Sequence, residues 1–242
     1  MSFARVTPID ERSAFGDFFR RVSIFRDLPE RALQDLAARV TVKHRVAGAV
    51  IVAQDEPAES FYMLHSGRAR VALFGDNGRE VTLSMLRPGD YFGEVSLFDG
   101  RPRSANVVAL TDVTVLVLDR EAFLTHLRTY PDSAVRLLGD MGRRLRHADE
   151  MIGNLALLDV YGRLARTLVG LAREEGTEPG SDGVVLRMRP TQQELAHMVG
   201  TCRETVSRAV SSLTRQGLVS NRGRGMLLAP RLVAMARARA AS

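Results

Sequence analysis

Three charged side chains, Arg203, Glu204 and Arg208, lie close together in a segment whose pattern predicts a short helix. At about 100° per residue they share one arc of that helix. The opposite arc is apolar and consists of Val206, Ala209, Val210 and Leu213. Arginine can donate to guanine O6 and N7, and glutamate can accept from the cytosine amino group, when such a helix enters the major groove. This arrangement predicts sequence-specific recognition of double-stranded DNA.

The residues around this helix have the spacing of a helix-turn-helix. Thr191 and Glu194 are placed as in a capping box, which predicts the start of a first helix. Gly200 supplies the turn, and the second helix is expected from about Cys202 to Arg215. A solvated polar face on an ordinary core helix is the alternative, but a capped first helix followed by a glycine turn favours DNA binding.

Charge is unevenly divided along the 242 residues. Residues 1–161 carry 21 basic and 22 acidic side chains, whereas residues 162–242 carry 13 basic and 6 acidic ones. The excess positive charge therefore falls on the segment with the helix-turn-helix, as phosphate binding requires. With a single cysteine, no signal-peptide pattern and no apolar run near the ~20 residues of a membrane span, we expect a cytoplasmic protein that contacts no membrane.

Upstream, from about Val40 to Arg120, short alternating apolar runs are interrupted by glycines. Regular short strands of this kind predict an antiparallel sandwich or closed β-roll. Asp76-Asn77-Gly78 is a hairpin-turn signal within it. The residues before the strands, 14–40, are expected to form short helices.

A long helix is predicted from about Pro131 to Leu158. Its apolar residues alternate spacings of three and four, which is the seam of a coiled coil: Leu138, Met141, Leu145, Ala148, Ile152 and Leu155. The alternative is one helix packed on its own domain, but so narrow a seam favours a homodimer. Asp159 can cap a following helix, so Leu158-Asp159 is the expected hinge between domains.

The segment Asp90–Asn106 combines groups that can bind a phosphorylated ligand. Gly93 allows the backbone to come close to a ligand. Arg103 and Ser104 supply a guanidinium and a hydroxyl for a phosphate. Glu94 can accept hydrogen bonds from a ribose. The segment lies between two expected strands, with three expected core anchors, Phe92, Leu97 and Phe98.

In these motifs the chain resembles the cyclic-AMP receptor protein (Crp/Fnr) family of bacterial transcription regulators. FGEVSLFDGRPRSA resembles the family's phosphate-binding cassette, GNLALLDVYGRLARTL its dimer helix and hinge, and GTCRETVSR its recognition helix. The resemblance implies an α+β protein with a cyclic-nucleotide-binding β-roll (1–130), a dimerisation helix (131–158) and a winged helix-turn-helix domain (159–242).

The same resemblance assigns site residues. The ligand site would comprise Gly93, Glu94, Val95, Arg103, Ser104, Ala148 and Asp149. Arg203, Glu204 and Arg208 would read a palindromic operator with TGTGA-like half-sites. The DNA phosphates would face Gln192, Gln193, Cys202, Thr205, Arg222 and Arg224. A second copy of the chain and RNA polymerase are the implied protein partners.

One departure affects the effector. Ala148 and Asp149 stand where cyclic-AMP receptors carry a Thr-Ser pair that meets the adenine amino group. Ionised Asp149 can accept from that amino group or, bidentately, from guanine, and it can also be a merely solvated residue. Cyclic AMP is the first expectation, with cyclic GMP, cyclic di-GMP or activity without a ligand as alternatives.

Other classes have less support. No nucleophile–base pair or paired acid site indicates an enzyme. The five histidines are scattered, so a cupin-type metal site is not expected, and one cysteine is too few for an iron–sulfur cluster. A haem sensor stays open, as does a redox role for Cys202.

Overall fold

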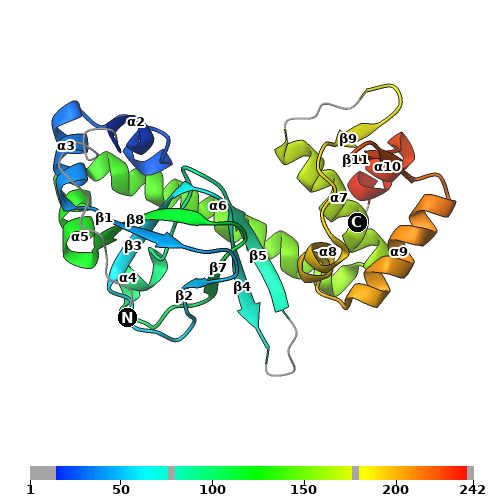
Figure 1. Cartoon of the computed structure of the whole chain (residues 1–242), viewed down its shortest axis with the longest axis horizontal. Coiled ribbons are helices and arrows are strands. Elements are labelled where there is room, and N and C mark those ends of the chain that lie inside the picture. The colour runs from blue at the N-terminus through cyan, green and yellow to red at the C-terminus, as the bar shows by residue number, and fades with distance from the viewer. Residues whose placement is uncertain (1–14, 76–79, 176–179, 239–242) are drawn as a thin grey trace. The chain divides into compact units, whose positions relative to one another are not determined.

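The structure, a computed structural model, describes residues 15–75, 80–175 and 180–238 of the chain (Figure 1). The chain divides into two compact units. The first holds residues 15–74 and 82–146, and the second holds residues 75, 80, 81 and 147–238 among those described. The long helix α6 (Pro131–Leu157) contributes residues to both, and it confirms the helix predicted from about Pro131 to Leu158.

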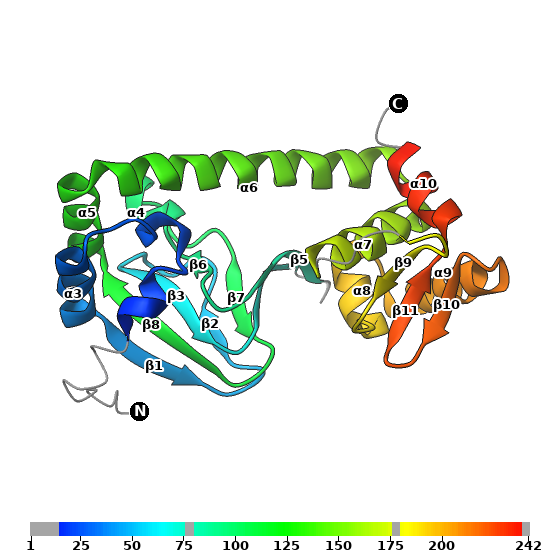
Figure 2. The same cartoon turned by 90° about the horizontal axis from the view of Figure 1, so that it is seen from above.

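The first unit contains two antiparallel sheets and several short helices (Figure 2). One sheet has the order β1-β8-β3-β6 and the other β2-β7-β4-β5. The strands are β1 (Thr41–Arg45), β2 (Val50–Val52), β3 (Ser60–Ser66), β4 (Ala69–Phe74), β5 (Glu80–Leu86), β6 (Tyr91–Phe92), β7 (Asn106–Ala109) and β8 (Val113–Asp119). The helices are α2 (Phe15–Phe19), η1 (Ser23–Phe25), α3 (Glu30–Arg39), α4 (Val95–Asp99) and α5 (Arg120–Thr129).

The sequence of strand β8, VTVLVLD, is apolar on both faces because the strand lies between two hydrophobic cores. Val115 and Val117 point into the core between the two sheets, together with Phe92 of β6. Leu116 and Leu118 point the other way, into a core shared with the N-terminal helices, α5 and the start of α6. Five of the seven residues of β8 are buried, on both faces of the strand, and this apolar burial favours its place between β1 and β3.

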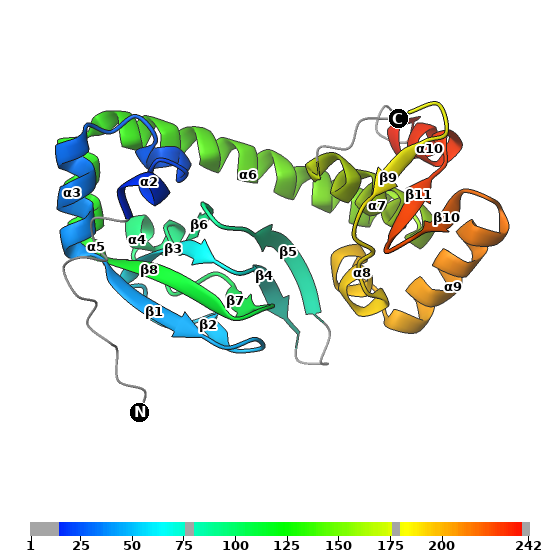
Figure 3. The same cartoon turned by 45° about the horizontal axis from the view of Figure 1, so that its top comes forward.

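The second unit packs helices on a small antiparallel sheet of order β10-β11-β9 (Figure 3). Its elements are α7 (Val160–Glu174), β9 (Val184–Leu186), α8 (Gln192–Val199), α9 (Arg203–Arg215), β10 (Val219–Arg222), β11 (Gly225–Leu228) and α10 (Pro230–Ala238). The two units together confirm the expected α+β class, with an N-terminal pair of antiparallel sheets and a C-terminal helix-turn-helix beside a small sheet.

The start signals expected in the second unit are confirmed. Thr191 Oγ1 accepts from the Glu194 backbone N–H at 3.1 Å, while the Thr191 N–H donates to the Glu194 carboxylate at 2.7 Å, which completes the capping box. Gly200 ends α8 in the left-handed conformation with φ +70°. Cys202 is the N-cap residue of α9 rather than its first residue.

Helix α6 ends at Leu157 and α7 begins at Val160, so the helical backbone is interrupted at Leu158 and Asp159, where the hinge was expected. Asp159 caps α7 by accepting from the Gly162 N–H at 2.7 Å. The hairpin-turn signal Asp76-Asn77-Gly78 lies outside the described residues. Among those described, none of the helices has both the length and the apolar character that crossing a bilayer requires.

Candidate ligand site and DNA-binding surface

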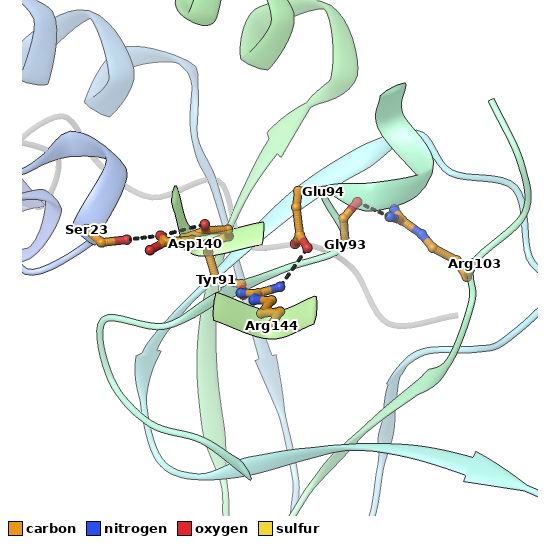
Figure 4. A network of polar contacts seen from close by, with 7 residues as sticks. All are labelled: Ser23, Tyr91, Gly93, Glu94, Arg103, Asp140 and Arg144. Carbon is orange, nitrogen blue, oxygen red and sulfur yellow. Dashed lines mark hydrogen bonds and ion pairs between the residues drawn. The ribbon is translucent and has the colours of Figure 1, made fainter. Parts of the chain in front are cut away.

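Arg103 is the buried cation of the predicted ligand site, and its side chain is built into the fold. Its Nη1 donates to the Gly93 carbonyl oxygen at 2.5 Å (Figure 4). Its Nη2 donates to the Ser60 carbonyl oxygen at 2.6 Å. The guanidinium carbon lies 5.6 Å from the centre of the Tyr62 ring. Arginine has five N–H donors, so two such bonds leave donors for a phosphate. The residue is 4% exposed, and burial lowers its pKa from the ordinary value.

Gly93 is required here for two reasons. Its φ of +83° is a conformation that side-chain-bearing residues rarely adopt. A Cβ atom at this position would also lie 2.8 Å from Arg103 Nη1 and 3.2 Å from the Tyr62 ring. The missing side chain of Gly93 therefore leaves room for the guanidinium of Arg103, whereas approach of the Gly93 backbone to a ligand stays a prediction.

Glu94 is a buried carboxylate with one oxygen in use. Arg144 Nη1 of α6 donates to Oε1 at 2.6 Å, and its Nη2 donates to the Tyr91 carbonyl oxygen at 2.8 Å (Figure 4). Oε2 is buried and has no hydrogen-bond partner among the described residues. Burial raises the pKa of Glu94, although the Arg144 charge opposes that shift. An unpaired buried oxygen is costly, so this site suits a ligand hydroxyl that donates to it.

The other predicted ligand residues lie at the surface. Ser104 is exposed beside Arg103, and Val95, the first residue of α4, is 46% exposed. Ala148 and Asp149 are exposed on α6. The structure thus joins Gly93 and Arg103 by a hydrogen bond, and Glu94 directly follows Gly93 along the chain.

One expectation about the cassette is wrong. Phe92 and Leu97 are buried core anchors, as expected, but Phe98 is 50% exposed. Helix α4 is only five residues long, so its single turn directs Leu97 inward, while Phe98 only meets the Phe123 ring edge-on. A five-residue helix has one buried side.

Sequence reasoning missed Arg144, Tyr91 and Asp140. Arg144 is 50 positions from Glu94 along the chain, so no local pattern joins the two residues. A usable signal was present: Arg144 precedes Ala148 by four residues, which places the two on one helix face.

The predicted DNA-reading face of α9 is exposed. Arg203, Glu204 and Arg208 are all exposed, and the opposite arc is buried, with Val206 at 0% and Leu213 at 2%. A hydrogen bond from its own backbone N–H lowers the pKa of Glu204, which favours the carboxylate form that can accept from a base.

The residues expected to face phosphates come from α8, from the start of α9 and from the β10–β11 hairpin. Thr205 is half-buried and its Oγ1 lies 3.1 Å from Cys202 Sγ, while Gln193 contacts His197 at 2.5 Å. Arg222, the last residue of β10, and Arg224, in the turn before β11, are both exposed in the predicted wing. Sequence reasoning missed Arg189, whose Nη1 donates to Asn221 in that wing at 3.1 Å.

The seam of α6 is largely uncovered. Leu138, Leu145 and Ile152 are 70, 64 and 65% exposed, and Leu155 is 45% exposed. Met141 differs, because it is half-buried and packs on the core of the first unit. A row of exposed apolar side chains on one helix is costly in water, which supports a partner helix.

Comparison with known proteins identifies both units. A model of the cyclic nucleotide-binding domain matches residues 42–130, and a model of the Crp-like helix-turn-helix domain matches residues 162–237. These two domains define a transcription regulator rather than an enzyme.

Individual relatives agree with the domain matches. The chain is 31% identical over 214 residues to the CRP-like cAMP-activated global transcriptional regulator of Mycobacterium tuberculosis, covering 88% of this chain and 94% of the relative. It is 37% identical over 179 residues to the cAMP-activated global transcriptional regulator CRP of Salmonella typhimurium, covering 74% and 84%. The c-di-GMP responsive global regulator CLP of Xanthomonas campestris is similar in structure, with a TM-score of 0.71 at 25% identity over 83% of this chain and 99% of that one. The chain belongs to the Crp/Fnr family of transcription regulators.

Proposed function

We propose that this chain is a homodimeric, sequence-specific DNA-binding regulator controlled by a cyclic nucleotide, cyclic AMP first, bound in the first unit. The observation that carries the proposal is the buried pair of Glu94 and Arg103, since the carboxylate keeps one free oxygen and the guanidinium keeps free donors. A cyclic nucleotide has groups for both: a ribose hydroxyl that donates and a phosphate that accepts. The relatives named as cAMP-activated support the choice of effector.

In this proposal the cassette residues divide the ligand between them. Glu94 accepts from the ribose hydroxyl, Arg103 and Ser104 donate to the phosphate, and Gly93 and Val95 supply backbone close to it. The phosphate brings negative charge to a buried cation, so binding removes an electrostatic cost that the ligand-free protein carries.

A second effector class is favoured by one residue. Asp149 is exposed on α6, where an ionised carboxylate can take two hydrogen bonds from guanine but one from the adenine amino group. Similarity to a c-di-GMP responsive regulator agrees with that alternative. The alternative function is therefore the same regulator responding to cyclic GMP or cyclic di-GMP, or acting without a ligand.

DNA binding in the proposal uses two copies of α9. The exposed seam pairs two α6 helices, and a two-fold dimer presents its recognition helices to half-sites about one turn of DNA apart. Arg203, Glu204 and Arg208 read a palindrome with TGTGA-like half-sites, while the wing arginines contact phosphates. RNA polymerase is the proposed protein partner at the promoter.

Control by the ligand requires that it bind two arrangements of the chain unequally. The break at Leu158-Asp159 lies between the helix that carries Asp149 and the helix-turn-helix, so we assign it as the hinge.

Calorimetric titration of the nucleotide-free protein with cyclic AMP, cyclic GMP and cyclic di-GMP tests the proposal. Saturable binding of one of them by the parent, lost in Glu94→Ala but kept in the surface variant Glu59→Ala, is the expected result. Absence of heat for all three would reject nucleotide control, whereas the DNA-binding assignment would stand.

A further inference from the structure

Asp140 is a buried carboxylate on α6 that belongs to no predicted site. Ser23 Oγ and Tyr91 Oη donate to its Oδ2 at 2.6 and 2.7 Å (Figure 4). Arg143 forms a salt bridge with the other oxygen, Oδ1. Both oxygens of Asp140 are therefore occupied by the protein itself, in contrast to Glu94, which keeps Oε2 free. This difference points to a structural task for Asp140 and a ligand-binding one for Glu94.

Tyr91 connects Asp140 to Arg144. The Tyr91 hydroxyl donates to Asp140, its carbonyl oxygen accepts from Arg144, and its ring centre lies 4.8 Å from the Arg144 guanidinium carbon. Burial raises the pKa of Tyr91 well above its ordinary value, so the hydroxyl keeps the proton that it donates. Because Asp140 and Arg144 are four residues apart, they occupy one face of α6 and hold Tyr91 at two points.

The contacts of Tyr91 with Asp140 and Arg144 lie close to the proposed ligand site. Tyr91 precedes Gly93 and Glu94 by two and three residues, and Phe61 packs on its ring with centroids 5.4 Å apart. The Arg144 side chain is 44% exposed, whereas that of Glu94 is 1% exposed. A half-exposed arginine has many rotamers available, so the ring and the carbonyl of Tyr91 are what orient it toward Glu94.

We propose that Asp140 is a positioning residue: through the Tyr91 hydroxyl it fixes the ring on which Arg144 rests, and so holds Arg144 against Glu94. Asp140 touches no ligand in this scheme. Ser23 of η1 completes the arrangement by donating to the same oxygen as Tyr91, which ties the N-terminal segment to the cassette.

A double-mutant cycle on nucleotide affinity tests this inference, and that readout rests on the proposed function. Tyr91→Phe removes one hydroxyl and keeps the ring. We expect it to weaken binding about threefold to tenfold, the usual worth of one hydrogen bond. In an Arg144→Gln background the same change should have less than about a twofold effect, because the residue through which it acts is gone. Equal losses in both backgrounds would overturn the proposal.

Tyr130→Phe is the matched control, since Tyr130 packs against the same core but lies outside the network. It should leave the affinity unchanged.

Hydrogen exchange of the nucleotide-free protein gives a readout that needs no ligand. The Leu97 N–H donates to the Glu94 carbonyl oxygen at 3.0 Å, so its exchange reports the order of the cassette turn. Tyr91→Phe and Asp140→Asn should both speed this exchange at least about threefold, while Tyr130→Phe should not. Unchanged exchange in both would overturn the positioning role. Faster exchange in a protein that binds no cyclic nucleotide would reject the proposed effector and keep the positioning role.

Discussion

Arg144 and Glu94 form a salt bridge of 2.6 Å in which only one of the two carboxylate oxygens takes part. The pair joins α6 to the residue that follows Gly93. Since α6 also carries the exposed apolar seam, a change at Glu94 is connected to the helix that we propose pairs the two subunits. This single contact therefore relates the proposed ligand site to the proposed dimer.

Replacing Arg103 by alanine should weaken nucleotide binding strongly. The loss of one charged hydrogen-bond partner costs about 1.5–3 kcal/mol, which is roughly a 10-fold to 150-fold loss of affinity. Calorimetry measures the affinity, and circular dichroism checks that the fold persists. Arg101→Ala, at an exposed position of the same loop, is the control and should bind normally. Equal affinity in the two variants would exclude Arg103 as the phosphate ligand.

The pH dependence of stability should change when Glu94 becomes glutamine. Burial raises the pKa of Glu94 above its ordinary value of 4.5, so the folded chain binds this proton more tightly than the unfolded chain. This group contributes stability below pH 4.5 that is lost as the pH rises through the raised value. Glu94→Gln should therefore lose less stability than the parent between pH 4.5 and neutrality.

Urea unfolding across that range measures the difference. The exposed control Glu59→Gln should follow the parent. Parallel curves for Glu94→Gln and the parent would contradict the assignment of a raised pKa.

A carboxylate on the seam of α6 should separate the subunits. Leu145→Asp and Ile152→Asp each place an unpaired charge in the proposed interface, at a cost of about 2 kcal/mol or more. Sedimentation velocity should show a shift toward monomer. The circular dichroism spectrum should stay close to that of the parent. Leu157→Asp is the same exchange at a leucine that is 80% exposed and off the seam, and it should stay dimeric. Dimers in all three variants would place the interface elsewhere.

Much of the helical structure could be predicted because its determinants are local. The capping box at Thr191, the left-handed Gly200 and the apolar arc of α9 are signals within a few residues of one another, and all are present. The strands of the first unit were predictable in the same way, because short apolar runs interrupted by glycines are local signals too.

What could not be predicted depends on contacts between distant segments. Arg144 meets Glu94 across 50 positions, and Ser23 meets Asp140 across 117, so neither pair leaves a periodic trace in the sequence. Phe98 was misjudged because apolar character alone does not tell which side of a five-residue helix is covered. The roles of the individual site residues stay predictions.

The two classes of arginine in the second unit should respond differently to alanine substitution. Arg203→Ala should cost about 1–3 kcal/mol on a specific palindrome and relax the preference at one base pair. Arg224→Ala should weaken binding to all sequences and reduce its salt dependence. Arg215→Ala, at the other end of α9, serves as the control. Unaltered affinity and base preference in Arg203→Ala would show that the recognition face is elsewhere.

Selectivity for the base should respond to Asp149. Asp149→Thr removes an acceptor that can take two hydrogen bonds from guanine, so the ratio of affinities for cyclic AMP over cyclic GMP should rise. Competition between the two nucleotides measures that ratio. Glu150→Thr removes the same charge one residue further on and should leave it unchanged. Identical ratios for the parent and Asp149→Thr would show that this residue does not read the base.

Fluorescence anisotropy of a labelled palindromic operator, titrated with nucleotide-free protein, tests nucleotide control of DNA binding most directly. The operator carries two TGTGA-type half-sites, and the titration is repeated with cyclic AMP, cyclic GMP or cyclic di-GMP in solution. We predict that one nucleotide, cyclic AMP first, raises the operator affinity at least about tenfold in the parent and has no effect in Arg103→Ala. If the operator affinity is the same with and without each of the three nucleotides, nucleotide control of DNA binding is contradicted.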